Sequence, residues 1–202
     1  MSSVTILNYG LGNIQAFANI YSRLNIPVTV ATAPEQLLGA EKIVLPGVGS
    51  FDWAMSRLND SGLRETLDEL VLEKKVPVIG ICVGMQMMAN RSEEGKLPGL
   101  GWVDAEVLRF KPSGDLPLPH MGWNDVKPAN SETLFLNIDS PRYYFLHSYY
   151  MRPNQPSAVL ATATYGHEFA AAVQSQNVFG TQFHPEKSHG WGIDLLRNFA
   201  ES

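Results

Sequence analysis

The sequence predicts an α/β fold with a largely parallel central sheet that carries helices on both faces. The chain has 202 residues, of which 45% are apolar, and this suits one domain with a sizeable core. In the first half, short apolar runs alternate with amphipathic stretches. The apolar runs are nearly continuous, which is the pattern of strands that helices cover on both faces of a sheet.

The elements of the first half follow from hydrophobic spacing. Strands are expected at the short apolar runs Val4–Leu7, Pro27–Val30, Ile43–Leu45 and Val76–Ile81. Apolar side chains three and four positions apart indicate amphipathic helices at 13–24 and at Leu63–Leu72. A further helix is expected at Met85–Ala89, shortly after the last of these strands.

The second half is typical of antiparallel additions to the sheet. Partly alternating runs between turn residues predict strands at Trp102–Leu108, Tyr143–Met151, Ala158–Thr164, Phe169–Gln174 and Val178–Phe183. A last helix is expected at Ile193–Ala200, and the proline-rich stretch Lys111–Pro119 predicts a loop. Because no repeat or linker divides the chain, residues 1–202 are expected to form a single flavodoxin-like domain.

Composition excludes several classes of protein. The net charge of −5 and the scattered basic residues argue against a nucleic-acid binder. Cys82 is the only cysteine, which rules out an internal disulfide and a cysteine-rich zinc site, and we expect neither a metal nor a cofactor. The first residues lack the basic and apolar regions of a signal peptide, and no apolar stretch reaches the ~20 residues that span a bilayer. We therefore expect a cytoplasmic protein without membrane contact.

The sharpest local signal is the segment Gly80–Gly84, with sequence GICVG. It lies between a buried strand and a helix, where a nucleophile on a tight turn needs flanking glycines to avoid clashes. The N–H groups of such a helix stabilise a thiolate and a developing oxyanion. Cys82 is therefore the candidate nucleophile, and the alternative is a buried structural cysteine.

A thiol nucleophile needs a base, and His184 closes the predicted strand Val178–Phe183. If that strand runs parallel to the one before Cys82, both residues lie at the same sheet edge. Glu186 follows two residues later and can orient the imidazole, which gives a Cys–His–Glu triad. The alternatives are a core or capping histidine and a solvent-exposed carboxylate.

Two glycine-containing turns follow other predicted strands. The turn Pro46–Gly49 is expected to form part of an oxyanion hole and of the substrate pocket, with a plain turn as the alternative. The turn Gly10–Asn13 resembles half of a dinucleotide fingerprint, but its third glycine and its later acidic residue are absent. We therefore expect no dinucleotide there.

In chain order these segments resemble the class I, or triad-type, glutamine amidotransferases, and more closely the glutaminase subunits of imidazole glycerol phosphate synthase. The resemblance runs almost end to end. Its motifs are Asn8–Ile14, Pro46–Phe51, Gly80–Gln86, Pro119–Asn124, Tyr143–Tyr149 and Gln182–Ser188. Val83 departs from the pattern, which usually has leucine there.

The resemblance implies a role for each matching residue. Cys82 would attack the glutamine carboxamide to give a thioester and release ammonia, while His184 shuttles the proton and Glu186 supports His184. The residues implied to hold glutamine or the oxyanion are Gly47, Val48, Gly49, Val83, Gln86, His147, Ser148 and Tyr149. The resemblance implies that the Val48–Gly49 peptide flips before catalysis, so low glutaminase activity is expected of the isolated chain.

The implied partner is a separate TIM-barrel cyclase subunit that receives the ammonia and makes imidazole glycerol phosphate and an aminoimidazole-carboxamide ribonucleotide (AICAR). The two subunits would form a heterodimer. The positions that match the partner interface are Asn13, Met121, Trp123 and Lys187. For Trp123 the alternative is core packing.

Other functions remain open on the residues alone. A paralogous glutaminase could supply ammonia for the amidation of a surface-polysaccharide sugar, since these motifs recognise glutamine and not the acceptor. A cysteine hydrolase or peptidase of the same broad fold is a second alternative, although Glu186 and Gln86 favour the amidotransferase. An intact Cys82, His184 and Glu186 argue against a non-catalytic binding module.

Overall fold

A central eight-stranded sheet organises the molecule. The computed structural model describes residues 3–111 and 116–202, so part of the predicted Lys111–Pro119 loop lies outside the described residues. The strands are β1 (Val4–Leu7), β2 (Val28–Ala31), β3 (Lys42–Gly47), β4 (Val78–Cys82), β8 (Lys127–Pro128), β11 (Val159–Tyr165), β12 (His167–Ser175) and β13 (Val178–Thr181). Their order is β2-β1-β3-β4-β13-β12-β11-β8. All pairs from β2 to β13 are parallel and the rest are antiparallel, which confirms the predicted sheet.

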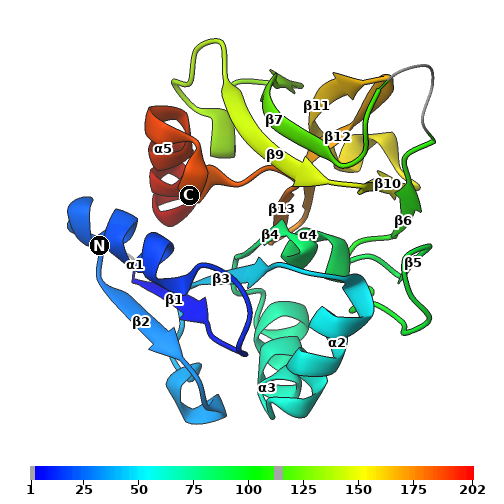
Figure 1. Cartoon of the computed structure of the whole chain (residues 1–202). Coiled ribbons are helices and arrows are strands. Elements are labelled where there is room, and N and C mark those ends of the chain that lie inside the picture. The colour runs from blue at the N-terminus through cyan, green and yellow to red at the C-terminus, as the bar shows by residue number, and fades with distance from the viewer. Residues whose placement is uncertain (1–2, 112–115) are drawn as a thin grey trace.

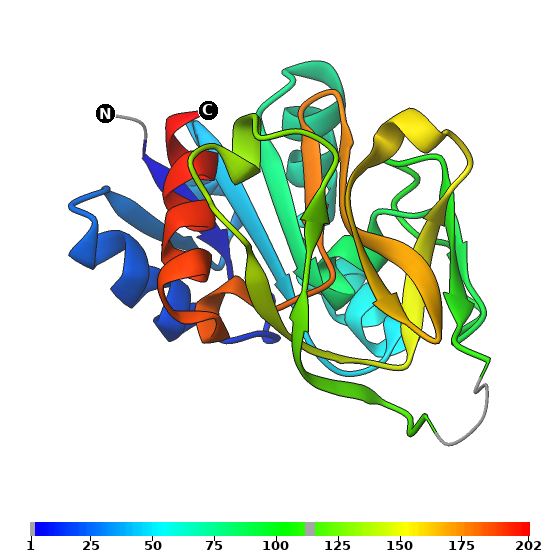
Figure 2. The same cartoon turned by 90° about the horizontal axis from the view of Figure 1, so that it is seen from above.

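Helices cover the parallel part of this sheet on both faces, as Figure 1 shows. The helices α1 (Ile14–Arg23) and α5 (His189–Glu201) contact each other on one face. On the other face lie α2 (Phe51–Asp60) and α3 (Arg64–Asp68), and α3 continues into a π-helical turn at Glu69–Glu73. Figure 2 shows the red α5 running alongside the strands. Double coverage explains why every residue of β1, β3 and β4 is buried.

Two smaller sheets adjoin the central one. One contains β5 (Arg91–Ser92), β6 (Ala105–Arg109) and β10 (Tyr149–Pro153), and the other pairs β7 (His120–Asp125) with β9 (Arg142–His147). The prediction of one strand at Tyr143–Met151 is therefore wrong, because the chain leaves β9 at Ser148 to pair with β6 as β10. The grouping of Val178–Phe183 with the antiparallel strands holds on one side only, because β13 is antiparallel to β12 but parallel to β4.

One helix was not predicted. The segment α2 buries Phe51, Ala54, Met55 and Leu58. These residues are three and four positions apart, which is itself a helical signal. The strands β5, β7 and β8 were not predicted either. The boundaries of the predicted elements differ by a few residues, and α5 begins at His189 rather than at Ile193.

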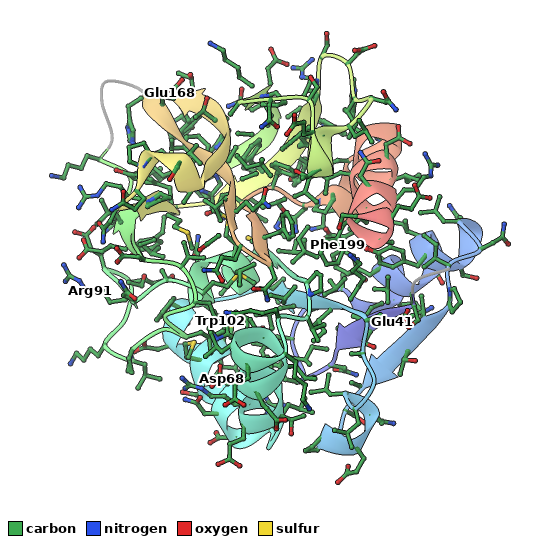
Figure 3. All side chains as sticks on the ribbon, turned by 180° about the vertical axis from the view of Figure 1, so that it is seen from behind. Glu41, Asp68, Arg91, Trp102, Glu168 and Phe199 are labelled. Carbon is green, nitrogen blue, oxygen red and sulfur yellow. The ribbon has the colours of Figure 1, made fainter. Side chains whose placement is uncertain are left out.

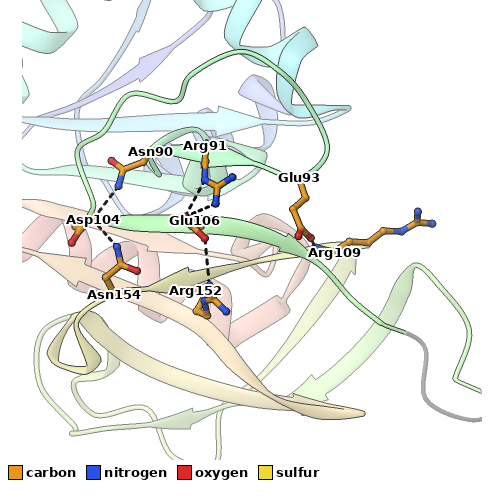
Figure 4. A network of polar contacts seen from close by, with 8 residues as sticks. All are labelled: Asn90, Arg91, Glu93, Asp104, Glu106, Arg109, Arg152 and Asn154. Carbon is orange, nitrogen blue, oxygen red and sulfur yellow. Dashed lines mark hydrogen bonds and ion pairs between the residues drawn. The ribbon is translucent and has the colours of Figure 1, made fainter.

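Polar contacts hold the sheet that contains β10 in place, as Figure 4 shows. The Glu106 carboxylate accepts from Arg91 Nη2 at 2.7 Å and pairs with Arg152 Nη2 at 3.3 Å. Asp104 Oδ1 accepts from Asn90 Nδ2 at 3.0 Å and from Asn154 Nδ2 at 2.8 Å. These contacts fix β10, whose first residue enters the candidate site.

A further bond ties the loop before β6 to the helical layer. Trp102 Nε1 donates to Asp68 Oδ1 at 2.8 Å, and Figure 3 labels both residues. No helix in the described part of the chain is long and apolar enough to cross a membrane.

Candidate active site

Cys82 lies on a strained turn between β4 and α4 (Val83–Met87). Its φ of 55° and ψ of −112° fall where a side chain is rarely tolerated. The neighbouring glycines make this turn possible. A Cβ on Gly80 would lie 2.7 Å from the Gly84 carbonyl oxygen, and a Cβ on Gly84 would overlap the Leu45 carbonyl oxygen. The turn thus has the backbone that the GICVG segment predicts.

His184 and Glu186 form a buried pair at the same sheet edge. The parallel register of β13 and β4 pairs Thr181 with Ile81, which brings His184 towards Cys82. Nδ1 of His184 lies 2.8 Å from Oε1 of Glu186, and the two side chains are only 5% and 3% exposed. Oε2 of Glu186 is buried and has no hydrogen-bond partner among the described residues.

The protonation of His184 reflects opposing effects. Burial lowers its pKa, but the side chains of Cys82 and Glu186 raise it more, to about 10. The imidazole is therefore held in its charged form between a thiol and a carboxylate. This arrangement can stabilise a thiolate and can donate a proton to a leaving group.

A cavity of about 310 Å³ opens at this edge. The predicted site residues that line it are Val48, Gly49, Cys82, Val83, Gln86, His147, Ser148, Tyr149, His184 and Lys187. Two of the predicted catalytic and glutamine-binding residues do not line the cavity. Gly47 pairs with Cys82 across β3 and β4, where a Cβ would overlap the Gly84 nitrogen, and Glu186 lies behind His184.

Gln86 joins two walls of the cavity. Its Nε2 donates to the Tyr149 carbonyl oxygen at 3.1 Å and to Gln182 Oε1 at 3.0 Å. The Nε2 of Gln182 in turn lies 3.8 Å from the Cys82 Sγ. Gln182 was not among the predicted site residues, although its place two positions before His184 at a strand end is a signal that could have identified it.

The cavity has further lining residues that the sequence analysis missed, namely Glu94, Pro119 and Leu146. Glu94 Oε2 accepts from the Phe51 backbone N–H at 2.9 Å at the start of α2. Burial raises the pKa of this carboxyl above its usual range. No local pattern marks Glu94, because a long-range contact brings its loop to the site.

The predicted interface residues lie at the surface. Met121 and Trp123 point to one face of β7 and are 65% and 38% exposed, so Trp123 is not a core residue. Lys187 Nζ and the Trp123 ring both approach the Tyr144 ring, at 5.9 Å and 6.3 Å from its centroid. The exposed Asn13 caps α1 by accepting from the Ala16 N–H at 3.4 Å, and α1 contacts Pro185–Lys187.

Among the described residues, no group of three or more His, Cys, Asp or Glu side chains is arranged to hold a metal ion. The arrangement at the cavity is that of a thiol, a charged imidazole and a carboxylate, which is suited to acyl transfer.

Comparison with known proteins gives a consistent result. Residues 5–202 match the family model for glutamine amidotransferase class-I. The chain is 58% identical over 202 residues to the imidazole glycerol phosphate synthase subunit HisH of Bdellovibrio bacteriovorus, with 98% of this chain and 99% of that protein covered. It is 47% identical to the HisH subunit of Leptospira borgpetersenii, with 98% of each chain covered.

Solved structures show the same fold at low identity. A glutamine amidotransferase crystal structure superposes with a TM-score of 0.78 at 21% identity and covers 99% of this chain and 98% of that one. The PurLQS structure from Thermotoga maritima gives 0.75 at 16% identity, with 99% and 98% covered. The chain therefore belongs to the class-I glutamine amidotransferases and, among them, to the HisH subunits of imidazole glycerol phosphate synthase.

Proposed function

We propose that this chain hydrolyses glutamine to glutamate with Cys82, His184 and Glu186, and passes the ammonia to a TIM-barrel cyclase subunit. The observation that carries the chemistry is the strained Cys82 turn beside a buried His184–Glu186 pair with a separation of 2.8 Å. The relatives named as HisH subunits support the pathway, which is histidine biosynthesis. Family membership also argues against the cysteine peptidase.

The proposed reaction has two halves. The charged His184 already holds the proton of the Cys82 thiol, and the Cys82 sulfur attacks the side-chain amide carbon of glutamine. The tetrahedral intermediate collapses when His184 returns a proton to the leaving nitrogen, which departs as ammonia and leaves a γ-glutamyl thioester. His184 then deprotonates a water that attacks the thioester, and this releases glutamate and the thiol. Glu186 accepts from Nδ1 throughout and holds the ring in place.

The oxyanion donors would be the N–H of Val83, at the start of α4, and the Val48–Gly49 peptide. Gly49 has a φ of +84°, and the Tyr9 hydroxyl anchors the start of this turn by donating to the Pro46 carbonyl oxygen at 2.6 Å. A turn anchored at one end can reorient at the other, which supports the expectation of low activity in the isolated chain.

Glutamine binding would use the other walls of the cavity. Gln86, Gly49 and the backbone of residues 147–149 would hold the substrate, while Gly47 would act only by letting β3 pack closely against the Cys82 turn. Glu94 is the lining residue whose carboxylate suits the α-ammonium group of glutamine, because opposite charges attract strongly in a partly buried site.

The partner would dock on the surface that carries Asn13, Met121, Trp123 and Lys187. Exposed apolar side chains beside a site opening are typical of a protein interface. We propose a heterodimer in which residues 1–202 act as one glutamine amidotransferase domain. The barrel subunit would make imidazole glycerol phosphate and AICAR, and a biosynthetic role of this kind implies the cytoplasm.

The test is glutamate release from glutamine, with and without the cognate barrel subunit and its imidazole-pathway nucleotide. We expect strong stimulation by both, and no activity in the Cys82→Ala variant. Cys82-dependent activity that ignores this partner would point instead to an amidotransferase for surface sugars. Inactivity under every condition would overturn the proposal.

A further inference from the structure

A row of hydrogen-bonded buried side chains, called the histidine network below, connects β7 to the cavity. The proposed chemistry does not use it. Its centre is the pair His120 and His147, which face each other in the register of β7 and β9. Nδ1 of His120 lies 2.9 Å from Nε2 of His147. The two residues are only 3% and 6% exposed, so their ring nitrogens depend on partners inside the protein.

The inner end of the histidine network fixes the proton on His147. Its Nδ1 lies 2.8 Å from the Tyr149 carbonyl oxygen. A carbonyl oxygen only accepts hydrogen bonds, so Nδ1 must carry a proton and donate it. In the neutral ring Nε2 then accepts, and the proton between the two rings belongs to Nδ1 of His120.

The outer end leads independently to the same assignment. Asn124 Nδ2 lies 2.8 Å from the Thr164 carbonyl oxygen, and Asn124 Oδ1 accepts from the Asp125 N–H at 2.8 Å, so the amide has one possible orientation. The same Nδ2 lies 3.3 Å from Nε2 of His120. That Nε2 must accept, which again leaves the proton of His120 on Nδ1.

The position of each proton in the histidine network is thus assigned. A further proton on either ring would place two N–H donors opposite each other. In agreement with this, burial lowers the pKa of His120 to about 4. Burial also lowers the pKa of His147, to about 3. The hydrogen bond to Tyr149 raises this pKa, and the charges of His120 and His184 lower it further. Aromatic stacking holds the His120 ring between Tyr165, at 4.1 Å, and Phe145, at 4.8 Å.

The Tyr149 carbonyl connects the histidine network to the site. It accepts from His147 at 2.8 Å and from Gln86 Nε2 at 3.1 Å, so two donors hold one oxygen. Gln86 continues to Gln182, and Gln182 reaches Cys82. A shift of this carbonyl would therefore move a cavity wall and the amides beside the thiol.

We propose that His120 and His147 are positioning residues, which hold the Tyr149 carbonyl and thereby set Gln86 for glutamine binding. The inference rests on the proposed glutaminase function and adds to it two side chains that act through a backbone carbonyl. Because the Tyr149 carbonyl holds Gln86 directly and reaches Cys82 only through Gln182, loss of these contacts raises KM for glutamine more than it lowers kcat.

The decisive comparison uses two substitutions at His120, assayed in the complex with the barrel subunit. His120→Phe keeps the aromatic stacking but removes the donor to His147, and leaves a buried lone pair there without a partner. His120→Asn loses the stacking but can place its Nδ2–H where Nδ1–H was. We expect KM to rise about tenfold in His120→Phe and less than threefold in His120→Asn, with kcat within threefold in both.

Stability is expected to follow the opposite order, with a lower Tm for His120→Asn than for His120→Phe, because the smaller side chain leaves a cavity. KM values that follow Tm would mean that His120 only packs, and this would overturn the proposal. An unchanged KM in His120→Phe would also overturn it.

A spectroscopic measurement needs no activity. The ¹⁵N shifts of the ring nitrogens at pH 7 should show both histidines neutral with the proton on Nδ1. A proton on Nε2 of either ring would overturn the inference while leaving the proposed function intact. Conversely, full activity in Cys82→Ala would sink the proposed function and leave the ¹⁵N assignment standing.

Discussion

Two clusters of buried histidine meet at the cavity and end in opposite states of charge. Burial lowers the pKa of His120, His147 and His184 alike. At His184 the thiol and the Glu186 carboxylate overcome burial and hold the ring charged. At His120 and His147 the partners are another imidazole, an amide and a carbonyl, and the rings stay neutral. The partner, and not the depth of burial, decides whether a histidine here moves protons or holds a position.

Cys82→Ala breaks the charged cluster at its nucleophile and has the largest expected effect. Glutaminase activity should fall by on the order of 10⁴-fold or more, since no other group can form the thioester. The rate of glutamate formation by the complex measures this. Retention of a tenth of the activity would mean that water attacks glutamine directly and that Cys82 is not the nucleophile.

Glu186→Gln removes the charge and keeps the shape. The pKa of His184 should fall, and kcat should drop on the order of 10²–10⁴-fold because the imidazolium loses its counter-charge. The pH–rate profile should shift with it. Glu73→Gln, at an exposed carboxylate on the π-helical turn, is the matched control and should be silent. Equal rates for the two variants would contradict an orienting role for Glu186.

The neutral pair should make the fold sensitive to acid. His120 and His147 have lowered pKa values in the folded chain, so the unfolded chain binds more protons as the pH falls below about 6.5. The free energy of unfolding should then fall by about 1.2 kcal/mol for each histidine between pH 6 and 5. Urea titrations of the wild type and of His120→Phe measure this, and the variant should have about half the slope. If the free energy of unfolding depended on pH equally in both proteins, the acid sensitivity would come from groups other than His120.

His184 should titrate at the opposite end of the scale. Its pKa is raised, so its contribution to stability is complete below about pH 6.5 and disappears as the pH rises towards 10. In an NMR titration its ring should stay charged at pH 8, where His120 and His147 are neutral. This is the smallest effect, because it shifts a titration curve and leaves turnover near pH 7 unchanged. A His184 ring that is already neutral at pH 7 would remove the contrast between the clusters.

The features that depend on neighbouring residues are predictable from the amino-acid sequence. Gly80 and Gly84 are readable in the chain because the turn at Cys82 cannot form with side chains at either position. The buried strands and most helices follow from hydrophobic spacing, and Glu186 lies two residues from the histidine that it contacts. Local backbone strain and hydrophobic periodicity depend on residues close together in the sequence, so both can be identified without knowledge of the tertiary structure.

The features that depend on distant residues became visible only in the folded protein. The pairing of His120 with His147 needs the register of β7 and β9, and Glu94 reaches the cavity only through its bond to the start of α2. The break at Ser148 also has no local cause, because β9 and β10 separate only when each finds its own partner strand. Strand register and loop docking arise from contacts between segments far apart in the chain, and hydrophobic spacing within one segment cannot specify them.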